Sequence, residues 1–339
     1  MKVSYGTMQM GSELSYESSH KLLDQYIEKG YYKLDTAQMY PVPGSQDHFC
    51  LTEKLLGDWV KKHTVNDQSK IRISTKFPNY SKRLTYLRKN KSNIISYQEL
   101  KDSITSSLKR LNIPIIDIYY IHWPSRATNN FGKSFYESSG NETSICYELE
   151  ETYSNLMMLK KEGLCRSIGV SNETSIALYS LKSATKESRD IDLYLQNSYN
   201  ILNPTLDINI TEFCLSTGIK IQAHSPLAFG VLTGKYQNNA LPRDSRRKLY
   251  PNYFDRYLTP RSCFMISELD QLCSEFKINI IELSYRFLLN NPAVSEIVIG
   301  VKNRDQLDYA IHSIEKGKLP AEIYKSIQQL LQEHSITSW

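Results

Sequence analysis

The sequence predicts an α/β protein, a (β/α)8 TIM barrel that forms one domain over residues 1–339, with long loops at the carboxyl ends of its strands and a C-terminal helix. Two observations lead to this prediction. Short β-branched or aromatic runs alternate along the chain with longer amphipathic runs. The short runs number eight, which favours a closed barrel over the open doubly wound sheet that the same alternation allows. No linker or low-complexity block divides the 339 residues, although their length alone also allows two domains.

The expected elements follow from the period of the apolar residues. The expected strands are Val3–Met8, Tyr32–Asp35, Ile71–Lys76, Ile116–Ile121, Ser167–Val170, Leu193–Gln196, Ile219–Ala223 and Ile297–Ile299. The clearest helical patterns between them are Ser15–Lys29, Ser96–Leu111, Tyr147–Lys161, Ser175–Thr185 and Ile280–Leu289. Because parallel strands need crossover connections of about this length, the alternation predicts parallel pairing.

Composition and charge exclude several classes of function. The chain is 40% hydrophobic with a net charge of +5, and it lacks a basic stripe with interleaved aromatic residues, which argues against nucleic acid as a partner. No segment approaches the ~18 consecutive apolar residues of a membrane span, and the first twelve residues contain no apolar run typical of a signal peptide. We therefore expect a cytoplasmic protein without a membrane partner, and its oligomeric state stays open.

The cysteines indicate neither disulfides nor a metal site. The six cysteines are scattered and form no C-x-x-C pair. This distribution is typical of buried free thiols in a reducing compartment. We expect no metal.

Polar side chains that can move protons follow the second, third and fourth expected strands. Asp35 ends the second strand and Tyr40 stands five residues beyond it, Lys76 ends the third, and His122 follows the fourth. Taken singly, each has an ordinary interpretation, such as a turn residue, a packed ring or a satisfied polar group. Lys76 is the least ordinary, because an ammonium drawn into a barrel needs a partner. Asp35 could be that partner.

Together these four side chains predict a general acid. A phenol with a pKa of about 10 is a slow proton donor near neutrality. A neighbouring Lys76 ammonium stabilises the phenolate and lowers the pKa of Tyr40. Asp35 would hold that lysine charged and in place, and His122 could donate a hydrogen bond to a substrate oxygen. The arrangement suits protonation of a carbonyl oxygen.

Several motifs in this order and spacing resemble the aldo-keto reductases along nearly the whole chain. They read LDTAQMY, ISTK, DIYYIHWP, SIGVSN, QNSYN and SPLAFGVLTGKY. The stretches MYPVP, HWPSRATNNFGK and GVSNETS are most similar to the bacterial Tas-like branch. The resemblance implies a (β/α)8 barrel that binds NADPH in an extended conformation and transfers hydride between the nicotinamide and the carbonyl carbon of a small molecule. It places the catalytic tetrad on Asp35, Tyr40, Lys76 and His122.

The resemblance also implies the residues that contact the cofactor and the substrate. Around the nicotinamide these are Gly6, Thr7, Met8, Asp35, Ser171, Asn172, Gln196 and His224. Over the pyrophosphate they are Ser225, Pro226, Leu227, Gly230 and Lys235, and around the adenosine phosphate Gly300, Lys302, Arg304 and Gln306. Candidate substrate contacts are Trp123, Phe131 and Tyr136, together with residues between Ala240 and Pro260.

The absence of two common phosphate-binding motifs is consistent with such a cofactor site. The chain has no G-x-G-x-x-G, and its Gly230 to Lys235 segment is one residue short of a P-loop and lacks the Ser or Thr. A dinucleotide would therefore be held by loop amides and Lys235. Lys302 and Arg304 favour NADPH over NADH, because only NADPH carries a dianionic 2′-phosphate.

The chain departs from the family pattern at several points. The first strand comes almost at once, so we expect the N-terminal hairpin of many relatives to be absent or shortened. His224 replaces a tyrosine that stacks on the nicotinamide; either it simply substitutes one aromatic ring for another, or its charge makes cofactor affinity depend on pH near 6 to 7. Tyr309 and Ala310 replace a Glu and an Asn that often contact the adenine.

The connection over residues 79–93 is basic and longer than in many relatives. It carries Lys82, Arg83, Arg88, Lys89 and Lys91. It is either a solvated surface loop or a basic lid near the catalytic mouth that favours anionic substrates.

The leading functional prediction is an NADPH-dependent reductase of aldehydes or ketones. One alternative is an NADPH-binding regulatory or redox-sensing subunit with little turnover, as in the potassium-channel β subunits of the family. A lyase or isomerase that uses Lys76 as a Schiff base fits poorly, because it leaves the SN, QN and SPLAFG motifs unexplained.

Overall fold

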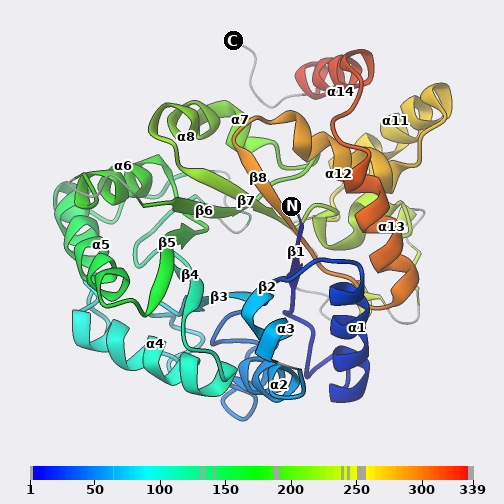
Figure 1. Ribbon diagram of the computed structural model, residues 1–339. Coiled ribbons are helices and arrows are strands. Elements are labelled where there is room, and N and C mark those ends of the chain that lie inside the picture. Colours follow the sequence, from blue (N-terminus) through cyan, green and yellow to red (C-terminus); the bar gives the residue numbers. More distant parts are fainter. Residues whose placement is uncertain are drawn as a thin grey trace.

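The computed structural model describes residues 3–63, 65–129, 132, 135–140, 142–186, 191–237, 240–242, 245–249 and 257–334. Eight parallel strands close into a barrel in which each strand pairs with its neighbour in the chain and β8 pairs with β1. Helices lie around the outside of this barrel (Figure 1). The predicted (β/α)8 fold is therefore confirmed.

The strands lie close to their predicted positions. They are β1 Val3–Gly6, β2 Lys33–Asp35, β3 Arg72–Phe77, β4 Ile116–Ile121, β5 Cys165–Ser171, β6 Leu193–Ser198, β7 Lys220–His224 and β8 Val294–Ile299. β4 has the predicted bounds. β1 ends two residues before the predicted Met8, because the chain turns there and the N–H of Met10 donates to the carbonyl of Thr7.

Helices fill the connections between the strands. Those of the first half are α1 Tyr16–Glu28, α2 Leu51–Val60, α3 Val65–Lys70, α4 Tyr97–Leu111, α5 Ile145–Lys161 and α6 Ser175–Ala184. Those of the second half are α7 Thr205–Asn209, α8 Thr211–Thr217, α9 Arg246–Leu249, α11 Pro260–Phe276, α12 Ile280–Asn290, α13 Arg304–Glu315 and α14 Ala321–Glu333, with 3₁₀ turns η1 Glu142–Ser144 and η2 Ala228–Thr233. None of the helices in the described ranges is long and apolar enough to cross a bilayer.

Local sequence explains where α4 begins and how it packs. Ser96 and Glu99 form a capping box, in which each side chain accepts a hydrogen bond from the other residue's backbone N–H. Leu100, Ile104 and Leu111 recur at helical spacing and are fully buried. Close approach of α2 to α4 requires Gly57, because a Cβ there would lie 1.8 Å from the carbonyl oxygen of Arg110.

Candidate active site

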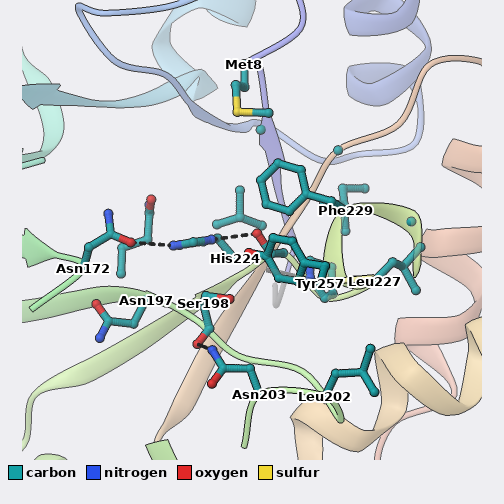
Figure 2. A pocket seen from close by; sticks show the side chains of 18 of the residues that line it. Met8, Asn172, Asn197, Ser198, Leu202, Asn203, His224, Leu227, Phe229 and Tyr257 are labelled. Atoms are coloured by element: carbon teal, nitrogen blue, oxygen red, sulfur yellow. Dashed lines mark hydrogen bonds between the residues drawn. The ribbon is translucent and has the colours of Figure 1, made fainter. Parts of the chain in front are cut away.

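A cavity of about 1880 Å³ opens at the carboxyl ends of the strands. This is the face at which barrel enzymes place their sites. Figure 2 shows one part of it, where Met8 lies across the opening from the side chains that follow β6 and β7. Its lining brings together residues from seven strand ends, namely Gly6, Asp35, His122, Ser171, Gln196, His224 and Ile299.

Beneath the cavity lies a buried ion pair. Lys76 Nζ lies 2.7 Å from Asp35 Oδ2 and donates a second hydrogen bond of 2.7 Å to the carbonyl of Thr36. The Lys76 side chain is 1% exposed. Burial lowers the pKa of Lys76, and the carboxylate of Asp35 opposes that shift. The pair thus keeps a cation in the interior of the barrel.

Tyr40 and His122 lie beside this ion pair at the cavity. Lys76 Nζ is 5.4 Å from the centroid of the Tyr40 ring. The Tyr40 and His122 rings meet edge to face with their centroids 5.8 Å apart, and both line the cavity. The buried Lys–Asp pair therefore lies against a phenol and an imidazole that face the same space.

His122 is held as a neutral imidazole. Burial, the ammonium of Lys76 and the nearby His224 together hold the pKa of His122 well below its usual range. Its Nδ1 is buried, and it neither accepts nor donates a hydrogen bond among the described residues. A neutral imidazole retains one N–H, so His122 can donate a hydrogen bond to a ligand oxygen without bringing a charge.

The segment that carries Tyr40 is anchored to α4 by Gln38. The amide nitrogen of Gln38 donates to Ser103 Oγ at 2.5 Å and to Ser107 Oγ at 2.9 Å. Its backbone N–H donates to the carbonyl of Lys76. Gln38 thus ties the loop after β2 both to a helix and to the strand that carries the lysine.

On the opposite side of the opening, Asn172 is fixed by three partners. Its Nδ2 lies 3.0 Å from the carbonyl of His122 and 3.1 Å from Ser171 Oγ. Because the amide nitrogen donates to these atoms, Oδ1 is an acceptor, and His224 Nε2 lies 3.2 Å from it (Figure 2). His224 Nδ1 lies 3.0 Å from Ser225 Oγ.

The loop after β7 turns sharply through left-handed backbone. Ser225, Ala228 and Phe229 have φ between 46° and 58°, and Gly230 has a φ of 97°. Turns of this kind can present successive peptide N–H groups to an anion. Lys235 lies against the same loop, since a Cβ on Gly230 would be 3.4 Å from its Nζ. The predicted pyrophosphate loop therefore combines backbone turns with a cation.

The third group of predicted cofactor residues follows β8. Lys302 lines the cavity and forms an ion pair with Glu13, and its backbone N–H donates to Gln306 Oε1. Arg304 pairs with Asp308 at 3.7 Å, its side chain is 65% exposed, and it is outside the cavity lining.

Tyr309 and Ala310, which replace the adenine contacts of many relatives, differ in their positions. Tyr309 lines the cavity, whereas Ala310 is buried in the core.

The structure gathers most of the predicted site residues around one cavity. Its lining includes Gly6, Met8, Asp35, Tyr40, His122, Trp123, Ser171, Asn172, Gln196, His224, Ser225, Pro226, Leu227, Gly230, Lys235, Gly300, Lys302 and Gln306. Thr7 and Lys76 are buried behind this lining, and Thr7 Oγ1 donates to the carbonyl of Asp35. Tyr136 is half exposed, donates to Glu142 and does not reach the cavity, and Phe131 lies outside the described residues.

Of the range between Ala240 and Pro260 that was predicted to contact the substrate, Tyr257 and Thr259 line the cavity. Phe229 also lines it and had not been predicted. Phe229 and Tyr257 have rings 5.0 Å apart, tilted by 34° (Figure 2). Phe229 stands inside the SPLAFG motif, which could have indicated it. Phe135 lines the cavity in place of its neighbour Tyr136.

Neither interpretation of residues 79–93, a solvated surface loop or a basic lid, is correct for Arg88. Arg88 is 5% exposed, its Nε lies 3.1 Å from Glu99 Oε1, and it donates to Asn79 and Ser92. It holds the loop together rather than facing a ligand. From this loop Ser81 and Leu84 line the cavity.

Within the described ranges, no cluster of three His, Cys, Asp or Glu side chains is arranged to hold a metal ion. All six cysteines are free thiols.

The fold and the site together define the class: a (β/α)8-barrel protein in which a buried Lys–Asp pair lies against a tyrosine and a histidine at the carboxyl ends of the strands. Comparison with known families matches residues 2–332 to the Aldo/keto reductase family. The chain belongs to this family, and membership makes it an oxidoreductase.

Individual relatives agree with this assignment. The chain is 30% identical to Protein tas of Escherichia coli, over 97% of this chain and 94% of that protein. It is 31% identical to an aldo-keto reductase of Babesia bovis, over 72% and 89% of the two chains. It is 25% identical to an NADH-specific methylglyoxal reductase of Escherichia coli, over 70% and 67%.

Proposed function

We propose that this protein reduces an aldehyde or ketone to an alcohol, with NADPH as the hydride donor and Tyr40 as the general acid. The observation that carries the proposal is the Lys76–Asp35 pair, 2.7 Å apart and buried beneath the Tyr40 ring. A cation at this place stabilises the phenolate that forms when Tyr40 releases its proton near neutral pH. We place the protein in the cytoplasm, acting on a small-molecule carbonyl.

The residues of the cavity fit a nicotinamide dinucleotide. The volume of the cavity exceeds the ~300–1,000 Å³ of sites for a single small ligand, so a dinucleotide and a substrate can share the cavity. Gln196 and Asn172 would hold the nicotinamide, the loop from Ser225 to Lys235 the pyrophosphate, and Lys302 a phosphate on the adenosine. When bound, the reduced nicotinamide supplies the hydride.

The chain's own residues supply the proton and the orientation. In this proposal Tyr40 donates its phenolic proton to the substrate oxygen, and Lys76 stabilises the phenolate that remains. Asp35 keeps Lys76 charged and fixed. His122, neutral by virtue of its lowered pKa, donates a hydrogen bond to the same oxygen. A positioned general acid of this kind accelerates a reaction by about 10²–10⁴-fold.

The preference for NADPH depends on a cation that can meet the 2′-phosphate. Lys302 supports it as the cation at the edge of the cavity, but Glu13 already pairs with it. One relative is named as NADH-specific, so similarity to relatives does not decide the cofactor. The two cofactors therefore have to be compared directly.

The test is oxidation of NADPH and of NADH by the purified protein against a panel of small aldehydes and ketones, some of them carboxylated. Turnover with NADPH at lower KM than with NADH supports the proposal. Equal KM values for the two would refute the cofactor preference alone. Tight binding without turnover on any carbonyl would favour the alternative, a regulatory or redox-sensing subunit. Failure to bind either cofactor would refute both.

A further inference from the structure

A chain of polar side chains crosses the interior of the barrel below the cavity. It runs from Asp35 on β2 to Gln196 on β6, Gln222 on β7 and Glu296 on β8. Gln196 is paired in register with Gln222, and Gln222 with Glu296, so three adjacent strands carry it at one level. All four side chains belong to residues that are only 2–3% exposed.

The two carboxylates at the ends of this chain fix the direction of the two amides between them. A carboxylate only accepts hydrogen bonds, so the Gln196 atom 2.7 Å from Asp35 Oδ1 is its nitrogen. The Gln222 atom 3.2 Å from Glu296 Oε1 is its nitrogen for the same reason. Gln222 therefore turns its carbonyl oxygen toward Gln196, whose nitrogen lies 3.1 Å away.

Two further side chains keep this arrangement in place. Tyr120 donates to the carbonyl oxygen of Gln222 at 2.6 Å, and its ring needs Gly169 as a neighbour, because a Cβ there would lie 2.5 Å from the ring. Lys33 Nζ lies 2.5 Å from the second oxygen of Glu296. Burial and the carboxylates of Asp117 and Asp35 raise the pKa of Glu296, and the ammonium of Lys33 opposes that shift. The contact with Lys33 is the observation that favours the carboxylate form, which accepts.

These hydrogen bonds decide which atom Gln196, which lines the cavity, presents to a ligand. An amide nitrogen has two N–H groups, and those of Gln196 are taken by Asp35 and Gln222. What Gln196 offers a ligand is its carbonyl oxygen. A buried acceptor binds a ligand N–H and penalises an analogue that lacks one, because the acceptor is then left unpaired.

We propose that Gln222 and Glu296 are positioning residues that hold Gln196 as an acceptor for the –NH₂ of the nicotinamide carboxamide. The site thereby discriminates against cofactor analogues without that N–H. This inference rests on the proposed function, because it takes the cavity to hold a nicotinamide.

The test compares NADP⁺ with its 3-acetylpyridine analogue, in which a methyl group replaces the carboxamide –NH₂. Dissociation constants for both are measured with the full-length protein by titration calorimetry. We expect the wild-type protein to bind NADP⁺ more tightly than the analogue. Gln222→Met frees one N–H of Gln196, and we expect it to reduce the ratio of the two constants by about 3- to 10-fold, the value of one neutral hydrogen bond.

A second set of variants tests whether the ratio depends on the direction of these hydrogen bonds or only on packing at position 222. Gln222→Glu alone sets two buried carboxylates against each other; we expect their repulsion to move the new acid away from Gln196 and so to reduce the same ratio. In the double variant Gln222→Glu/Glu296→Gln the acid and the amide exchange places. The acid at position 222 accepts from Gln196, Tyr120 and the new amide, whose oxygen accepts from Lys33. We expect the double variant to regain the wild-type ratio.

Glu282→Gln is the matched control. Glu282 is a largely buried acid on α12 that pairs with Arg286 and Lys316, and its replacement should leave the ratio unchanged. A ratio unchanged by Gln222→Met, or no recovery in a folded double variant, would overturn the inference. Equal wild-type affinity for NADP⁺ and the analogue would overturn it too, while leaving the proposed function intact. Absence of binding to both would overturn the inference and the proposed function together.

Discussion

Lys76 Nζ lies 2.7 Å from Asp35 Oδ2, and both side chains are at most 4% exposed. Taking two charges out of water is costly, and their attraction offsets that cost only while both are present. In the proposed function, the position of the pair beneath Tyr40 gives the two buried charges a chemical use.

Removal of one member of the pair should destabilise the protein more than removal of both. Lys76→Met leaves Asp35 as a buried carboxylate without its cation, and we expect it to lower the free energy of unfolding by about 3–5 kcal/mol. Asp35→Asn/Lys76→Met removes both charges and should recover part of that loss without restoring turnover. Urea unfolding measures the free energy of unfolding of the single and the double variant. A double variant no more stable than Lys76→Met would argue against the buried-charge account.

His122 should make stability depend on pH. The folded protein keeps His122 neutral because its pKa lies well below the usual range, whereas the unfolded chain takes up a proton as the pH falls through about 6.5. The unfolded state then binds more protons. His122 therefore contributes stability above about pH 6.5 that is lost as the pH falls toward the folded pKa, by up to about 1.4 kcal/mol per pH unit.

The variant His122→Asn should flatten this dependence. Urea unfolding is measured between about pH 5 and 8 for this variant, for the wild-type protein and for His48→Asn, which replaces an exposed histidine. We expect His48→Asn to keep the wild-type slope. An unchanged slope in His122→Asn would show that His122 is protonated in the folded protein.

Glu13 should weaken the preference for NADPH. It forms an ion pair with Lys302, and a 2′-phosphate has to compete for that ammonium. Glu13→Gln frees Lys302, so we expect the affinity for NADPH to rise about tenfold and the affinity for NADH to stay the same. Asp58→Asn, which removes a surface carboxylate from α2, serves as the control. An equal gain for both cofactors would contradict this role for Lys302.

Arg88 should matter for stability, whereas its neighbour Arg83 should not. Arg88 is buried, pairs with Glu99 and donates to backbone and side-chain oxygens, so we expect Arg88→Gln to cost about 2–3 kcal/mol. Arg83 is exposed, and Arg83→Gln should stay within about 0.5 kcal/mol of the wild-type protein. Thermal or urea unfolding checks both. Equal effects would restore the surface-loop interpretation for the whole segment.

The parts of the fold and site that could be predicted depend on local periodicity and on the geometry of parallel strands. The run Ile116–Ile121 is a strand with the predicted bounds, because its composition and its flanking turns agree. Asp35, Lys76 and His122 meet because the carboxyl ends of parallel strands lie at one face of a barrel. Their spacing along the chain was therefore enough to place them together.

The rest depends on contacts between distant segments. Nothing in the sequence around Gln222 or Glu296 distinguishes a side chain inside the barrel from one outside it. The run of charges around Arg88 is typical of a solvated loop, but the guanidinium is buried among Glu99 of α4, Phe77 of β3 and oxygens of its own loop. The pair between Glu13 and Lys302 joins the loops after β1 and β8, which become neighbours only when the barrel closes.

The variant Tyr40→Phe asks whether the phenol of Tyr40 donates the proton in the proposed reaction. The measurement is turnover with NADPH and the best carbonyl of the panel, with the dissociation constant of NADPH measured in parallel and Tyr179→Phe, an exposed tyrosine on α6, as the control. We predict that Tyr40→Phe loses about 10²–10⁴-fold in turnover and binds NADPH as the wild-type protein does, while Tyr179→Phe is unchanged. Wild-type turnover in Tyr40→Phe would contradict the account.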